Sequence, residues 1–256
     1  MKKRIAVLVV FLICIASVGF IWRYFVNVPT EEIVPYADVP DMPAPQPTPE
    51  LPQIIVIEPA EEQPPLPIPR DIREEFALLR EQYDNDDIVG RIVIEGTSVN
   101  YLVTQTGDNE FYLHHDINKT PNQAGWVFLD FENNIARQDR NTIIYGHNMR
   151  EDIRFHSLRR FLCEEFFNDN RYVILNTLYD DYIWEIFAFY ITDTDFRYLQ
   201  VIFPTQADFY GLATEMKARS MHDSEIIVTA DDRILTLSTC VGADNLRYVL
   251  NARLIQ

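Results

Sequence analysis

Eight short segments rich in β-branched and aromatic residues follow one another after residue 87. Turn-forming residues, such as Gly96 and the pair Asp180 and Asp181, separate most of them. The segments are residues 88–95, 99–104, 125–131, 141–145, 172–176, 182–191, 233–239 and 247–255. Because no regular alternation with helices runs through them, the pattern predicts a mostly β fold, an eight-stranded barrel that is closed or nearly closed.

Helical spacing of apolar residues marks three further segments. Residues 71–83 begin with Asp71 as an expected N-cap and place Glu74 three residues later. Their apolar stripe consists of Ile72, Phe76, Leu79 and Tyr83. We expect a second helix over residues 153–167 and a third over residues 206–218, after Pro204, in the connection between the sixth and seventh strands.

The N-terminal quarter of the chain lacks these patterns. Residues 1–4 carry three positive charges, and residues 5–23 contain an uncharged run of eighteen residues closed by Arg23. Such a run can nearly cross a hydrocarbon core of about 30 Å, and the charge distribution places the N-terminus in the cytoplasm. A cleaved signal peptide is the alternative; we favour a retained anchor because Ala16–Gly19 is a poor cleavage site inside the apolar run.

Proline dominates the next segment, residues 24–70. Thirteen of the fifteen prolines lie between Pro29 and Pro69, among acidic residues. This composition predicts an extended linker that holds a domain of residues 71–256 away from the membrane, although an unstructured tail without a spacing role has the same composition.

The net charge of −17 narrows the range of partners. It argues against binding nucleic acid, or an anionic lipid surface, through broad electrostatics. It is compatible with an amine-bearing partner, but an acidic surface also serves solubility.

Three residues suggest acyl-transfer chemistry. Cys240 directly follows the seventh strand segment, Arg247 comes seven residues later, and His147 lies two residues after the short strand of residues 141–145. A thiolate attacks a carbonyl carbon, a guanidinium stabilises the resulting oxyanion, and an imidazole transfers protons. We therefore expect Cys240, His147 and Arg247 to be catalytic residues of a cysteine acyltransferase or protease.

These segments resemble a known family. Residues 236–240 read TLSTC with an Arg downstream, residues 145–149 read YGHNM, and both are similar to the catalytic segments of sortases, most closely class B. The resemblance covers residues 71–256. It implies a sortase-type barrel with an N-terminal helix and a helix between the sixth and seventh strands.

The resemblance also implies a function. A class B sortase is a membrane-anchored transpeptidase on the outside of a Gram-positive cell, which cleaves a sorting motif near the C-terminus of secreted proteins. Its cysteine forms a thioester that an amine of peptidoglycan or of a pilin resolves. Neither a metal nor an organic cofactor is expected.

Four further residues have less direct claims to a role in this chemistry. Ser238 and Thr239 are expected to bind substrate or support the site, and a purely structural serine remains open. Arg253 competes with Arg247, but it lies about 20 Å further along the strand. Cys163 is expected to be a small buried residue of a helix.

Four histidines are expected to have no catalytic role. We expect His114 and His115 to lie on an extended segment and to point in opposite directions, which disfavours a metal site. His156 and His222 are expected at the surface. Two functional alternatives stay open: a cell-surface cysteine protease and an anchored binding module without catalysis.

Overall fold

The computed structural model describes residues 70–137, 139–149, 153–240 and 245–255, with the backbone alone at Cys240. The expected cytoplasmic residues 1–4, the expected anchor at residues 5–23 and the proline-rich linker up to residue 69 lie outside the described residues. Within the described ranges, no helix is both long and apolar enough to cross a membrane.

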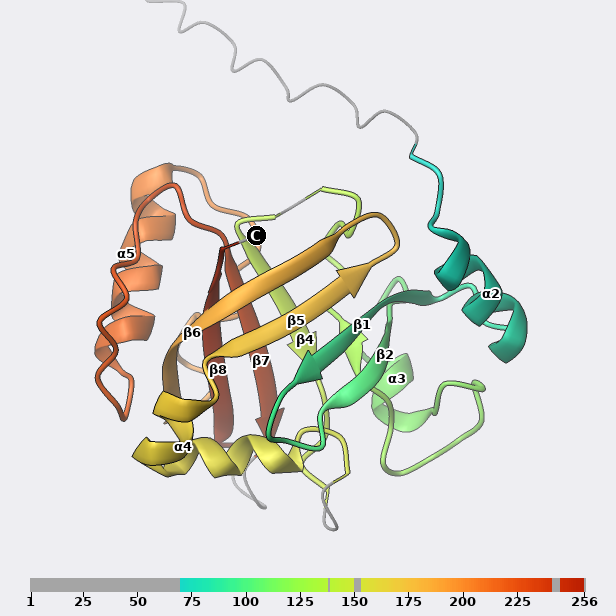
Figure 1. Ribbon diagram of the computed structural model, residues 1–256, viewed down its shortest axis with the longest axis horizontal. Coiled ribbons are helices and arrows are strands. Elements are labelled where there is room, and N and C mark those ends of the chain that lie inside the picture. Colours follow the sequence, from blue (N-terminus) through green and yellow to red (C-terminus); the bar gives the residue numbers. More distant parts are fainter. Residues whose placement is uncertain (1–69, 138, 150–152, 241–244, 256) are drawn as a thin grey trace, which may run out of the picture. The chain divides into compact units, whose positions relative to one another are not determined.

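Eight strands form a closed barrel, which confirms the expected mostly β fold (Figure 1). The order around the barrel is β1-β2-β3-β4-β7-β8-β6-β5. The strands are β1 (Ile88–Ile94), β2 (Asn100–Thr104), β3 (Phe128–Leu129), β4 (Asn141–Tyr145), β5 (Tyr172–Thr177), β6 (Asp181–Thr192), β7 (Ile234–Cys240) and β8 (Arg247–Leu254). Two pairs are parallel, β2 with β3 and β4 with β7, and the other pairs are antiparallel.

The third strand is much shorter than the expected range of 125–131. Gly125 has a φ of +53° and its N–H donates to the carbonyl of Asn122, so a turn precedes the strand. The carbonyl of Asp130 accepts a hydrogen bond from the N–H of Asn133, so another turn follows it. Residues 128–129 alone pair with β4.

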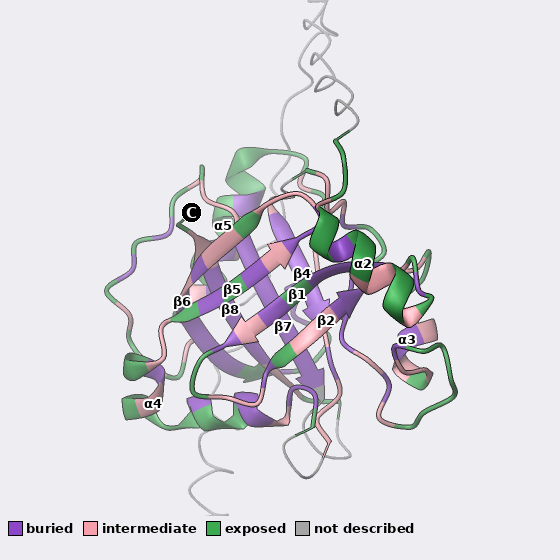
Figure 2. Cartoon of the chain, turned by 45° about the vertical axis from the view of Figure 1, so that its right-hand side comes forward, coloured by how far each residue is buried: buried purple, intermediate pink, exposed green. Residues whose placement is uncertain are grey.

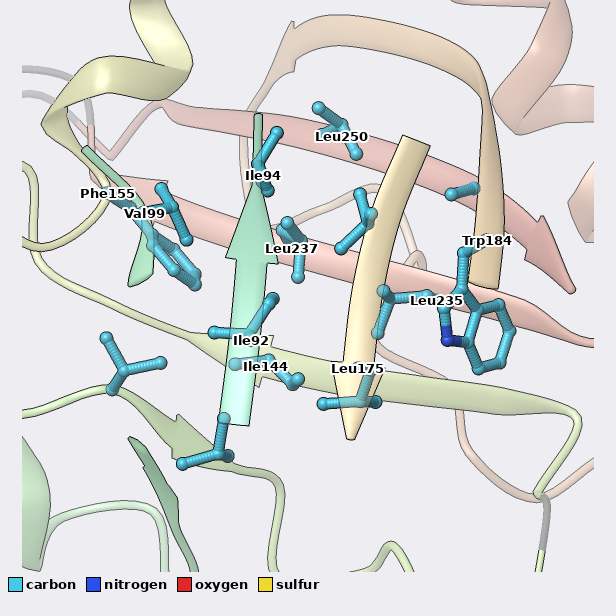
Figure 3. Close-up of a cluster of buried hydrophobic side chains, with 14 of the residues drawn as sticks. Ile92, Ile94, Val99, Ile144, Phe155, Leu175, Trp184, Leu235, Leu237 and Leu250 are labelled. Carbon is cyan, nitrogen blue, oxygen red and sulfur yellow. The ribbon is translucent and has the colours of Figure 1, made fainter. Parts of the chain in front are cut away.

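Apolar side chains from alternate strand positions fill the barrel (Figure 3). Leu235 and Leu237 of β7 belong to this interior cluster, as do Leu250 of β8 and Trp184 of β6. Buried positions alternate with partly or fully exposed ones along β5, whose outer face is open to solvent (Figure 2). A second apolar cluster lies on the outer face of β6, β7 and β8 and includes the buried face of a helix.

That helix is α5 (Gln206–Ala218), and it lies between β6 and β7 as expected. Thr205 and Asp208 form a reciprocal capping box at its start. Phe209, Ala213 and Met216 are its buried residues. The start of α5 is thus fixed by a cap between neighbouring residues, and its buried face packs in the second cluster.

The first described helix is α2 (Glu74–Tyr83), so Asp71 is not its N-cap. The cap position is Arg73, which makes no side-chain capping bond and instead donates from Nη1 to Asp181 Oδ1 over 2.6 Å. Ile72 precedes the helix and is exposed, whereas Phe76 is buried. The ion pair between Arg73 and Asp181 of β6 keeps residues 71–73 from forming the first helical turn that the local sequence predicts.

The helix expected over residues 153–167 is broken. A 3₁₀ helix, η1 (His156–Leu162), is followed by the short α4 (Glu164–Asp169), and Cys163 between them has an extended backbone. Cys163 is exposed, so the expectation that it is buried is wrong. The break shifts the helical phase, so that Leu158 and Phe161 become buried and Cys163 does not.

Candidate active site

The strand order brings the segments with candidate chemistry together. β4 and β7 are parallel neighbours, with Tyr145 paired to Ser238, so their C-terminal ends lie at the same edge of the barrel (Figure 1). β8 begins at this edge, and its first residue, Arg247, pairs with Cys240. His147 follows β4 by two residues. The placement of the Cys240 thiol lies outside the described part of the chain.

A cleft of about 340 Å³ lies at this edge. Four of the five expected site residues line it: His147, Ser238, Thr239 and Arg247. The other lining residues are Asn109, Glu110, Leu113, Phe128, Tyr145, Gly146, Thr194, Tyr198 and Leu199. The cleft is thus formed by the ends of β4, β7 and β8, by the segment around residue 110 and by the connection after β6.

The half-buried ring of His147 is held by a backbone carbonyl. Its Nε2 lies 2.9 Å from the carbonyl oxygen of Leu113. A carbonyl only accepts hydrogen bonds, so Nε2 carries the hydrogen in this arrangement, and in the neutral ring the lone pair is on Nδ1. The ring also packs on Gly125, where an added Cβ would lie 2.9 Å from Cδ2 of His147.

Ser238 and Thr239 are both buried beside the cleft. Ser238 Oγ lies 3.0 Å from the hydroxyl of Tyr198, so Tyr198 is the partner that the structure gives it. The carbonyl of Tyr198 accepts a hydrogen bond from Nδ2 of buried Asn141, which fixes the connection after β6 to β4. Thr239 Oγ1 has no hydrogen-bond partner within the described ranges.

The two candidate arginines have different surroundings. Arg247 is half-buried, lines the cleft and donates from Nη1 to the carbonyl of Leu246 over 3.0 Å. Arg253 pairs in register with Ile234 at the opposite end of β7, and its Nη2 lies 3.1 Å from Glu185 Oε2. Of the two, only Arg247 is therefore a cation of the cleft.

A tyrosine adds a polar group that the sequence analysis missed. The hydroxyl of Tyr145 donates to Asp130 Oδ2 over 2.7 Å, and Asn109 Nδ2 donates to the same oxygen over 2.8 Å. Burial, followed by the negative charge of Asp130, raises the pKa of Tyr145 well above its usual value, so the hydroxyl stays protonated. Tyr145 lies two positions before His147. Since residues two apart on an extended segment point to the same side, this spacing was a signal that would have found Tyr145.

The remaining histidines do not line the cleft. His114 ends a short helix, α3 (Phe111–His114), so the expected extended segment is wrong there. The ring of His115 stacks on Phe111 at a centroid distance of 4.1 Å. His156 and His222 are half-buried rather than fully exposed, and both make hydrogen bonds. The described residues contain no group of three or more His, Cys, Asp or Glu side chains suited to a metal ion.

Comparison with known proteins agrees with this geometry. A family model described as the sortase domain matches residues 92–255. The chain belongs to the sortase family. Among curated relatives, sortase B of Listeria monocytogenes is 38% identical over 170 residues, which are 66% of this chain and 68% of the relative. Sortase B of Staphylococcus aureus is 34% identical over 188 residues, 72% of this chain and 76% of the relative.

Solved sortase structures have the same fold as this sortase. A Bacillus anthracis protein described as similar to sortase B matches with a TM-score of 0.67 and 37% identity, over 72% of this chain and 84% of the other. A Staphylococcus aureus sortase B–substrate complex matches with a TM-score of 0.69 and 33% identity, over 73% of this chain and 87% of the other. The relatives place this sortase in class B, and the cysteine transpeptidase role follows from the family.

Proposed function

We propose that this sortase cleaves a C-terminal sorting motif of secreted proteins and transfers the acyl group, through a thioester on Cys240, to an amine of peptidoglycan or of a pilin. One observation carries the proposal: His147, just after β4, and Arg247, at the start of β8, line a single cleft at the edge where β7 ends with Cys240. The solved substrate complex of Staphylococcus aureus sortase B is consistent with such a substrate.

In the first half-reaction, the Cys240 thiolate attacks the carbonyl carbon of the scissile peptide bond. A carbon–sulfur bond forms, and the carbonyl oxygen becomes an oxyanion beside the guanidinium of Arg247. His147, which has taken the proton of the Cys240 thiol to become an imidazolium, gives that proton to the leaving amine as the carbon–nitrogen bond breaks, which leaves a thioester and a neutral imidazole. Because Nε2 is bound to Leu113, the nitrogen that transfers the proton is Nδ1.

In the second half-reaction, an acceptor amine attacks the thioester carbon and His147 takes its proton. The carbon–sulfur bond breaks, a new amide forms and the Cys240 thiolate is regenerated. Without an acceptor amine, water resolves the thioester, so the same site acts as a thiol endopeptidase. None of these steps requires a metal or an organic cofactor.

The sequence supports a location for this chemistry outside the cell. Residues 5–23 serve as a single membrane span with the N-terminus in the cytoplasm, and residues 24–70 serve as a spacer. Tethering near the membrane raises the encounter rate with substrates that are still in transit across it. Protease treatment of intact cells tests this location, because a catalytic domain that stays protected contradicts it.

The activity is tested with the full chain and a peptide that carries a candidate sorting motif, with and without an amine acceptor. We expect an acyl-enzyme mass on Cys240 and a ligation product that depends on the amine, both absent from Cys240→Ala. Hydrolysis unaffected by any amine would instead support the cysteine protease. A Cys240 that does not react with an alkylating agent in the folded protein would support the binding module.

A further inference from the structure

Arg154 is a buried cation with an uncommon backbone conformation. Arg154 is 8% exposed. Its φ of +57° lies in the left-handed region, which residues with a side chain rarely adopt. Burial lowers the pKa of Arg154, although a guanidinium remains protonated in proteins. No ion pair with a carboxylate is made by Arg154 within the described ranges. A buried charge without a carboxylate partner and a left-handed backbone conformation both cost free energy, so the surroundings must hold Arg154 in place.

The surroundings are two aromatic rings and one carbonyl. The Arg154 Cζ lies 4.1 Å from the ring centroid of Trp126 and 5.3 Å from that of Tyr101. Its Nε and Nη2 both donate to the carbonyl oxygen of Gly125, over 3.0 Å and 2.8 Å. The Arg154 N–H donates to the hydroxyl of Tyr101 over 2.9 Å. The guanidinium is thereby fixed, and with it the peptide group that follows Gly125.

Gly125 lies where there is no room for a side chain beside either part of the histidine hydrogen bond. A Cβ at this position would lie 2.8 Å from the carbonyl oxygen of Leu113 and 2.9 Å from Cδ2 of His147. These are the carbonyl that binds Nε2 of His147 and the ring that it orients. A movement of Gly125 therefore changes the position of the imidazole relative to its hydrogen-bond acceptor.

The chain after Arg154 supports the same histidine from its backbone side. The N–H of Phe155 donates to the carbonyl of His147 over 3.0 Å, and residues 148 and 154 form an antiparallel bridge. Arg154 thus acts on His147 at two points, through the Gly125 carbonyl and through the adjoining residue of its own chain.

We propose that Arg154 is a positioning residue for the transpeptidation reaction, which holds Gly125 so that His147 keeps its hydrogen on Nε2 and presents Nδ1 for proton transfer. The inference rests on the proposed function, since it concerns the acid and base of that reaction. Arg154 itself takes no part in bond making, because its donors are directed at a backbone carbonyl.

The test compares Arg154→Met with a matched control, Arg160→Met, in the full chain. Arg160 makes the same kinds of contact elsewhere: its Cζ lies 4.4 Å from the ring centroid of Phe166, and it donates to the carbonyl of Gly96, another glycine with a positive φ. Neither Arg160 nor Gly96 lines the cleft. Both variants lose a cation on an aromatic ring and a bond to a glycine carbonyl, but only Arg154→Met disturbs His147.

We expect Arg154→Met to lower kcat by about 10-fold to 10²-fold while KM for the sorting peptide changes by less than about twofold. Arg160→Met keeps kcat. Arg154→Lys retains the charge but cannot bridge with a planar fork, so it recovers part of the rate. If Arg154→Met does not fold, Arg154→Lys is judged by the same measurements.

A second readout is independent of turnover. In protein labelled with ¹⁵N at histidine, and assigned with His147→Gln, the neutral ring of His147 should show a protonated Nε2 and an unprotonated Nδ1. In Arg154→Met the two nitrogen signals should converge as both tautomers become populated. Unchanged signals, or an unchanged kcat, would overturn the positioning role. A wild-type chain that makes no amine-dependent product but keeps the two distinct signals would instead count against the proposed function.

Discussion

Cys240 and Arg247 face each other across the ladder between β7 and β8. This pair is at the end of the ladder next to the cleft, whereas Arg253 pairs with Ile234 at the other end. The register therefore selects Arg247 as the guanidinium next to the proposed nucleophile. A shift of the register would move Arg247 along the strand and away from Cys240.

The first prediction concerns these two arginines. Arg247→Ala should lower the rate of acyl-enzyme formation by about 10² or more, because the oxyanion loses a donor that is already in place. Arg253→Ala is the matched control, and it should leave that rate within about twofold while losing the contact with Glu185. Single-turnover kinetics with mass detection of the acyl-enzyme measure both rates. A rate loss confined to Arg253→Ala would transfer the role to that residue.

The second prediction concerns the hydrogen bond between Tyr198 and Ser238. Both hydroxyls are buried at the cleft wall, so Tyr198→Phe and Ser238→Ala should each lower kcat/KM, and the double variant should lose less than the sum. We expect a coupling energy of about 0.5 to 1.5 kcal/mol in the double-mutant cycle.

Tyr190→Phe is the control for that cycle. The buried Tyr190 hydroxyl has no hydrogen-bond partner within the described ranges, so its removal should leave kcat/KM unchanged and not reduce stability. Strict additivity of Tyr198→Phe and Ser238→Ala would show that the bond does not shape the cleft.

Local signals were sufficient for much of the fold. The strand of residues 141–145 and the helix of residues 206–218 were predicted with their observed boundaries, because strand propensity in one and a capping box in the other act within a few residues. Local signals do not suffice where a distant partner sets the boundary of an element. Arg73 forms an ion pair with Asp181, and α2 begins at Glu74, later than an N-cap at Asp71 would place its start.

The candidate site divides in the same way. His147 and Arg247 were predicted from residue type and position at strand ends, and the closed barrel brings them to one cleft. Tyr198 and Arg154 carried no signal, because one lies in a long connection and the other acts through the backbone of Gly125. The positions of both side chains depend on contacts between segments far apart in sequence, and hydrophobic periodicity does not encode such contacts.

The third prediction concerns the core. Phe189 of β6 is fully buried and packs on Phe161 and Tyr248, with ring centroids 5.9 Å and 5.8 Å away. Phe189→Ala should lower the free energy of unfolding by about 3–5 kcal/mol, because it removes buried area and leaves a cavity. Phe131→Ala, at an exposed position, should change it by no more than about 0.5 kcal/mol. Urea unfolding followed by circular dichroism measures both, and similar losses would contradict the assigned burial.

The fourth prediction concerns alkaline pH. Burial raises the pKa of Tyr145, and also those of Tyr112 and Tyr190, above the ordinary value of 10.0. Below that value both the folded and the unfolded chain keep these protons, so these groups give the free energy of unfolding no pH dependence. Above it, the unfolded chain releases protons that the folded chain retains.

Unfolding is then favoured as pH rises. Each such tyrosine lowers the free energy of unfolding by up to about 1.4 kcal/mol per pH unit, until the pH reaches its pKa in the folded chain. Tyr145→Phe removes one of these groups, so its stability should fall less steeply above pH 10 than that of the wild type. Below pH 9, Tyr145→Phe should be less stable than the wild type by about 1 kcal/mol, because Asp130 loses a donor. Urea unfolding at a series of pH values measures both differences, and equal slopes above pH 10 would show that the Tyr145 hydroxyl is not protected in the folded chain.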